Sequence, residues 1–154
     1  MRGTRAFTMF AIVTAVGVAC NDNNATSLPP GLEVYTASLN GANERLTPVT
    51  TTATGTAVVT VLGNQLSWKV DITSAIDSVI LGHIHHAPRD SAGPVRVNFN
   101  PAPTGAAFTG TLTQGSFTLT GDSVQTWLRQ GNAYVNIHTK KNGAGEIRGQ
   151  LAKP

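Results

Sequence analysis

Short alternating runs of apolar and polar residues constrain the fold of this chain more than any other feature. Successive side chains of a β-strand point to opposite faces, so alternation gives a strand one apolar and one polar face. Two runs show the pattern clearly, 95–99 (VRVNF) and 133–138 (AYVNIH). One buried and one wet face is typical of antiparallel sheets. The sequence therefore predicts an antiparallel all-β fold.

Gly, Asn and Pro separate these runs at spacings typical of a sandwich or barrel. Leu62-Gly63-Asn64-Gln65 predicts a tight hairpin, and Ser123–Gln130 predicts a short helix that Ser123 caps and Gly131 ends. The architecture we expect is a Greek-key antiparallel β-sandwich of seven or eight strands with one short helix. The expected strands are Glu33–Leu39, Thr54–Leu62, Gln65–Ile72, Val79–His86, Val95–Phe99, Ala107–Leu112, Ala133–His138 and Glu146–Leu151.

Composition excludes several classes of protein. Only 12% of the residues are charged, and those from 21 onward carry nine basic and eight acidic side chains. Without a basic run to hold a phosphate backbone, nucleic acid is not an expected partner. Cys20 is the only cysteine, so no disulfide can form within one chain.

Residues 1–20 have the pattern of a signal peptide. Arg2 and Arg5 precede an uncharged apolar stretch from Ala6 to Val18, which is too short to span a bilayer comfortably. Gly17-Val18-Ala19-Cys20 resembles the lipobox of bacterial lipoproteins, with Gly17 in place of the usual large aliphatic residue. The alternative is a plain secretory signal whose cysteine is incidental.

Lipidation of Cys20 predicts an exported protein that is anchored to a membrane by two or more acyl chains. Residues 21–32 are polar and then Pro-rich, which favours a flexible linker to a domain over 33–152. Asn21 rather than Asp follows the cysteine, which by the usual sorting rule favours the outer membrane. We expect the domain to face the periplasm or the cell surface.

Four short motifs occur in order along the domain. They are LNGANE at 39–44, GHIHHA at 82–87 followed by Gly93-Pro94-Val95, YVNIHT at 134–139 and GEIRGQL at 145–151. In this order and spacing they resemble the CHRD domain, from Glu33 to Leu151. The family is named for repeats in chordin, an extracellular antagonist of growth factors. The resemblance implies a binding module without a recognisable catalytic set, and its partner is an unidentified envelope or extracellular protein.

A fainter resemblance is to copper/zinc superoxide dismutase, also a Greek-key β-sandwich. The copper strand of that family is similar to His83-Ile84-His85, and its later histidine and arginine match His138 and Arg148. The resemblance implies that the three histidines are copper ligands and that Arg148 guides an anion. The bridging histidine, the zinc loop and the cysteine pair have no counterpart. Dismutase activity is therefore not expected, although a mononuclear metal site could remain.

The residues themselves also support a metal site. His83 and His85 share one face of their strand, and His138 is the candidate for a third imidazole on another patterned strand. His86 points to the opposite face. Three neutral imidazoles suit copper or zinc, and copper binds more tightly by the Irving–Williams order.

The alternative is a polar network that binds nothing. Asn136, Glu146 and Arg148 lie on the same kind of position as His138, and Glu146 and Arg148 could brace each other and orient the imidazole. Asn40, Asn43 and Glu44 favour a capped turn over a calcium site. Two hypotheses therefore remain: a lipid-tethered binding module that is not an enzyme, and a copper protein for storage, transfer or weak redox chemistry on superoxide.

The anchor gives the first testable prediction. In cells fed a palmitate analogue, we expect the wild-type protein to be labelled and Cys20→Ser to be unlabelled. Equal labelling of both proteins contradicts lipidation at Cys20.

Overall fold

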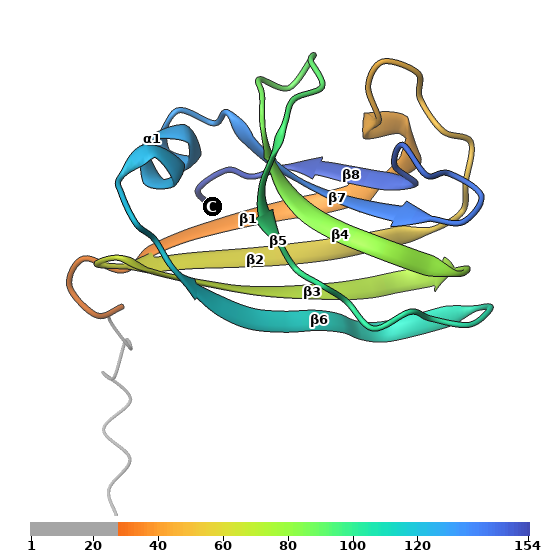
Figure 1. Cartoon of the computed structure of the whole chain (residues 1–154), viewed down its shortest axis with the longest axis horizontal. Coiled ribbons are helices and arrows are strands. Elements are labelled where there is room, and N and C mark those ends of the chain that lie inside the picture. The colour runs from red at the N-terminus through yellow and green to blue at the C-terminus, as the bar shows by residue number, and fades with distance from the viewer. Residues whose placement is uncertain (1–27) are drawn as a thin grey trace, which may run out of the picture.

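The computed structural model describes residues 28–154, and an antiparallel sheet of eight strands dominates them (Figure 1). The predicted signal peptide 1–20, with Cys20, and residues 21–27 of the predicted linker lie outside the described residues. The strands are β1 (Glu33–Asn40), β2 (Thr54–Leu62), β3 (Gln65–Ile76), β4 (Val79–His86), β5 (Val95–Asn98), β6 (Phe108–Thr118), β7 (Ala133–Thr139) and β8 (Ile147–Gln150). The helices are a 3₁₀ turn, η1 (Gly41–Asn43), and α1 (Ser123–Arg129).

The strand order is β5-β4-β7-β8-β1-β2-β3-β6, and every pair is antiparallel. The predicted all-β fold with one short helix is therefore confirmed. The sheet curls into two layers, which stay joined through β1 and β8. At this junction Asn40 pairs with Arg148, and Thr36 bridges to Ala152.

The curl brings the two ends of the sheet over each other (Figure 1). Trp68 of β3 stacks on Phe99, just after β5, with ring centroids 5.0 Å apart. The core between the layers is apolar and includes Val59, Leu66 and Ile84, each at most 1% exposed. Burial of this surface is what holds the fold, because no disulfide is available.

Two strands are longer than their sequence indicates. β3 continues to Ile76, and β6 continues to Thr118 instead of ending at Leu112. The extra part of β6 is rich in Thr, Ser and Gly and is mostly exposed, so it has little hydrophobic pattern. Its pairing with β3, from Gln65↔Thr118 onward, makes it a strand. Tertiary pairing thus overrides a weak local preference.

The ends of α1 match the prediction only in part. Gly131 follows the helix with a φ of 70° and donates its N–H to the Leu128 carbonyl, as a terminating glycine should. The predicted capping role of Ser123 is wrong. Ser123 is the first helical residue, and Asp122 holds the N-cap position without a side-chain hydrogen bond.

The predicted wet face of β7 is also wrong, because all seven residues of this strand are buried. Val135 and Ile137 face the apolar core. Tyr134, Asn136 and His138 face the other side, where the β1–β2 and β4–β5 connections cover them. Figure 1 shows both connections arching over the β4-β7-β8 side of the sheet. A covered polar layer, rather than a solvated surface, thus lies on this face.

Within residues 28–154, no helix is both long enough and apolar enough to cross a membrane.

The core can be tested at Ile137, which has no exposed surface. We expect Ile137→Ala to lower the free energy of unfolding by about 2–5 kcal/mol, since it leaves a cavity under the polar layer. Leu62→Ala, at a side chain that is 48% exposed, is the control and should cost less than about 1 kcal/mol. Urea unfolding followed by circular dichroism measures the free energy of unfolding of each variant. Equal losses in the two variants contradict the placement of Ile137 in the core.

Candidate metal centre

Two neighbouring strands bring three histidines together. His83 and His85 lie on β4, His138 lies on β7, and the two strands pair with His83 opposite Asn136. One ring nitrogen of each histidine lies within 4.8 Å of those of the other two. The three side chains are 6–8% exposed. The predicted juxtaposition of His83, His85 and His138 is thus present.

Backbone carbonyls fix the tautomers of two of these rings. His85 Nδ1 lies 2.9 Å from the Gly93 oxygen, and His138 Nδ1 lies 3.1 Å from the Gly143 oxygen. A carbonyl can only accept, so each Nδ1 carries the proton and donates. In the neutral ring, Nε2 then holds a free lone pair.

Those lone pairs point into the cluster. His138 Nε2 lies 3.1 Å from His83 Nδ1. His85 Nε2 is buried and has no hydrogen-bond partner. An unpartnered buried acceptor is costly and rare in native proteins. Together with the two other ring nitrogens it forms a group that could hold a metal ion.

The environment keeps the three imidazoles neutral. Burial, reinforced by His138 and His85, lowers the pKa of His83 to about 4. Burial also lowers the pKa of His85 and of His138, against the opposing effect of their carbonyl partners. Neutral imidazoles are the form that binds metal ions.

Gly93 connects the β4–β5 connection to the cluster. Its carbonyl accepts from His85, and its N–H donates to the Tyr134 hydroxyl over 3.1 Å. A Cβ at this position would clash with the carbonyl oxygen of His86 and approach Ala87 Cβ to 2.9 Å. Only glycine lets the backbone come close enough to make both bonds.

His86 lies on the opposite face, as predicted. It stacks on Trp127 of α1 with ring centroids 4.1 Å apart. The Arg96 guanidinium lies 4.8 Å from the same tryptophan. His86 is therefore a structural histidine that attaches the helix to the sheet.

The three residues predicted to surround the histidines lie in the covered polar layer without bonding to a ring. Arg148 places its guanidinium 3.5 Å from the centroid of Tyr134. Asn136 donates to Glu44 Oε2 over 3.3 Å. Glu146 accepts from the Thr139 hydroxyl over 3.0 Å and from the Asn142 amide.

Glu146 and Arg148, which the polar-network alternative could have paired, each have other partners. Backbone carbonyls orient the histidines instead. The Asn40–Glu44 turn is as predicted: the Asn40 side chain accepts from the Asn43 N–H over 3.0 Å, and the Asn43 amide donates to the Arg148 carbonyl over 3.1 Å.

Glu44 was expected in that turn, but its burial was not. It is 3% exposed, and its Oε1 has no hydrogen-bond partner. Burial raises its pKa to about 7, against the opposing effects of Asn136 and Arg148. Both carboxylate oxygens lie 2.6 Å from where a Cβ on Gly145 would stand, which explains a glycine there.

Tyr134 is the other part of the site that the sequence did not reveal. Its ring is parallel to that of His85 within 10°, at a centroid distance of 4.9 Å. The period-two pattern places Tyr134 on the same face as Asn136 and His138. That pattern was the available signal, but the face was expected to be wet.

A cavity of about 820 Å³ lies next to the cluster, between the β1–β2 connection and the β7–β8 turn. The histidines do not line it, but Gly143, whose carbonyl holds His138, does. The other lining residues are Glu44, Arg45, Leu46, Thr47, Pro48, Val49, Thr50, Ala92, Lys141, Asn142, Ala144 and Gly145.

Comparison with known families agrees with the sequence motifs. The family model of the CHRD domain matches residues 35–151, which is most of the chain. The chain belongs to the CHRD domain family. No curated protein and no solved structure matches the sequence significantly.

The raised pKa of Glu44 predicts a pH-dependent stability. Its pKa is 4.5 as a free side chain and about 7 in the folded protein. Such a group stabilises the folded state fully below pH 4.5 and progressively less as the pH rises towards 7. Glu44→Gln carries no titrating proton at this position. Between pH 4.5 and 8 its free energy of unfolding should therefore rise by on the order of 3 kcal/mol relative to that of the wild type.

Urea unfolding of both proteins at several pH values measures this difference. The histidines are the same in both proteins, so their contribution to the pH dependence cancels in the difference. A difference that stays constant with pH contradicts the raised pKa.

Proposed function

We propose that this chain is an exported, lipid-anchored CHRD-domain binding module, not an enzyme, and that His83, His85 and His138 bind one copper ion. The membrane anchor is Cys20, and the domain faces the periplasm or the cell surface. The pattern of the signal peptide and its single cysteine support the anchor. The side-chain geometry of the domain supports the metal site.

The observation that carries the metal site is the pair of carbonyl-held tautomers. Metal-ligating histidines typically donate their other ring N–H to a carbonyl or a carboxylate, which fixes the ring and aims its lone pair. His85 and His138 both have this arrangement, with Gly93 and Gly143 as acceptors. A polar network that binds nothing does not explain why His85 Nε2 is left without a partner.

The ion would replace a hydrogen bond. Without metal, His83 Nδ1–H donates a hydrogen bond to His138 Nε2. With metal, the same two nitrogens and His85 Nε2 would be ligands, and the His83 proton would reside on its Nε2, so that the ring stays neutral. Nitrogens bound to one ion at about 2 Å lie roughly 3–3.5 Å apart, so the present spacing of up to 4.8 Å closes with small ring movements.

The donor set favours copper. Three imidazoles without a carboxylate suit copper or zinc rather than magnesium or calcium, and copper binds more tightly than zinc at the same nitrogens.

The site favours binding over turnover on superoxide. An anion-guiding arginine must present its charge to solvent near the metal. Arg148 is 2% exposed and is separated from His85 by the ring of Tyr134. Storage or transfer of copper fits this geometry better, and recognition of an envelope protein by the same domain is compatible with it.

Titration of the purified protein with Cu²⁺ tests the site. We expect one ion per chain, and we expect His83→Ala/His85→Ala to weaken binding at least 100-fold, since two of three ligands are lost. His86→Ala is the matched control: it removes a neighbouring histidine from the opposite face and should bind copper like the wild type.

Equal affinity in the wild type and the double variant contradicts the proposed site. A loss in His86→Ala as large as in the double variant shows binding at the protein surface instead. A parallel Zn²⁺ titration should give weaker binding at the same residues, and tighter zinc binding contradicts the choice of copper.

A further inference from the structure

A buried cation lies beside the histidine cluster. The three imidazoles are neutral, and the group that could hold a metal contains no carboxylate and no thiolate. Arg148 is nearly inaccessible to solvent. Among residues 28–154, no carboxylate lies within 4.0 Å of its guanidinium. The protein thus keeps an unpaired cation in the interior beside a neutral site.

Arg148 faces the cluster through a stack of side chains. Because β7 lies between β4 and β8, His85 and Arg148 approach Tyr134 from opposite sides. The guanidinium is 3.5 Å from the Tyr134 centroid, and the His85 ring is 4.9 Å beyond it. One aromatic ring lies between the charge and a metal ligand.

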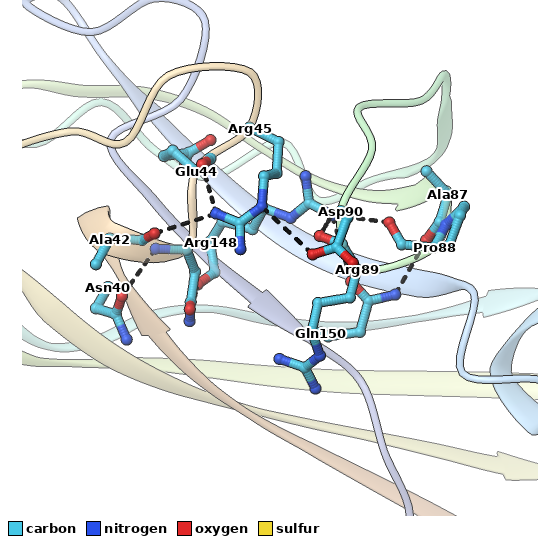
Figure 2. A network of polar contacts seen from close by, with 11 residues as sticks. Asn40, Ala42, Glu44, Arg45, Ala87, Pro88, Arg89, Asp90, Arg148 and Gln150 are labelled. Atoms are coloured by element: carbon cyan, nitrogen blue, oxygen red, sulfur yellow. Dashed lines mark hydrogen bonds and ion pairs between the residues drawn. The ribbon is translucent and has the colours of Figure 1, made fainter.

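Backbone oxygens hold the guanidinium in place without neutralising it. Arg148 Nη2 donates to the carbonyls of Pro88 and Arg89 over 3.3 and 3.1 Å (Figure 2). Burial lowers the pKa of Arg148, with Arg45 and Arg89 adding repulsion, but an arginine stays protonated in proteins. A buried charge without a counter-ion is expensive, so this one invites a functional explanation.

The nearest carboxyl offsets the charge only in part. Glu44 bonds to Asn136 rather than to Arg148. Burial holds the pKa of Glu44 at about 7, so it is largely neutral below that pH. Arg45 and Arg89 add repulsion to the Arg148 charge, and of these two Arg45 pairs with Asp90 over 3.9 Å.

From this arrangement we infer that the site selects the cuprous ion over the cupric ion, and that the buried charge of Arg148 is the cause. The inference rests on the proposed copper site and deepens it. An ion with one positive charge is repelled less by Arg148 than an ion with two. Three neutral nitrogens provide no negative charge to compensate.

The size of the effect follows from Coulomb's law. At an effective dielectric constant of about 20 to 40, a unit charge roughly 8–10 Å away disfavours the additional charge of Cu²⁺ by roughly 4- to 30-fold. For a one-electron couple a tenfold change corresponds to 59 mV, so the bound copper should have a raised reduction potential.

The test compares two dissociation constants in each protein. Cu⁺ affinity is measured without oxygen by competition with bicinchoninate, and Cu²⁺ affinity by competition with nitrilotriacetate. The value compared between variants is the ratio of the Cu²⁺ dissociation constant to the Cu⁺ dissociation constant. Arg148→Gln should lower this ratio roughly 4- to 30-fold. Arg148→Lys keeps the charge but loses the planar fork, and it should retain most of the wild-type ratio.

The outcomes separate charge from packing. If Arg148→Gln and Arg148→Lys lower the ratio equally, the arginine acts through packing and the inference is wrong. If copper binds but Arg148→Gln leaves the ratio unchanged, the inference is wrong while the proposed site stands. If neither ion binds the wild type, the proposed site itself fails, and the inference with it.

A second variant keeps the test decisive where Arg148→Gln does not fold. At pH 8, Glu44→Gln removes a negative charge from the same layer and should raise the ratio of the Cu²⁺ to the Cu⁺ dissociation constant. Arg129→Gln is the distant control, since Arg129 forms an exposed pair with Glu33, and it should leave the ratio unchanged. No rise in Glu44→Gln contradicts the electrostatic account.

Discussion

Burial of β7 on both faces is the constraint on which the rest of the structure depends. One face packs into the core between the layers, as a strand of a curled sheet must. The other face carries Tyr134, Asn136 and His138, and the polar groups there need partners once water is excluded. The β1–β2 and β4–β5 connections and the β7–β8 turn supply partners for the Asn136 amide, the Tyr134 hydroxyl and the His138 ring, through Glu44, Gly93 and Gly143, and Asn136 Oδ1 is left without one. The loops are thus parts of the site and not only links between strands.

The same covering explains why backbone carbonyls, rather than acidic side chains, orient the histidines. A carbonyl fixes a tautomer without adding charge to a dry interior, where each unpaired charge is expensive. The arrangement leaves the imidazoles neutral and aims their lone pairs inward. Its cost is strict glycine at Gly93, where the chain has no room for a Cβ. Arg148, held against Tyr134 and two further carbonyls (Figure 2), is the buried cation of this layer.

Period-two alternation was enough to predict the all-β fold and to place His83 and His85 on one face, with His86 on the other. It also pointed to His138, because β4 and β7 both show the pattern. It failed where partners distant in sequence decide: the pairing that extends β6, and the loops that bury Glu44 and the polar face of β7. Local sequence carries no signal for which loop covers which face. The Gly93 carbonyl and the Tyr134 stack could therefore not be predicted.

Three imidazoles from two strands are proposed to bind one ion. X-ray absorption spectroscopy of the copper-loaded protein measures this most directly, because it counts the atoms bound to the metal and recognises imidazole rings. We expect a first shell of three nitrogen atoms at about 2 Å with the multiple scattering of three imidazoles. A first shell without imidazole multiple scattering, or with that of fewer than three imidazoles, contradicts the central claim.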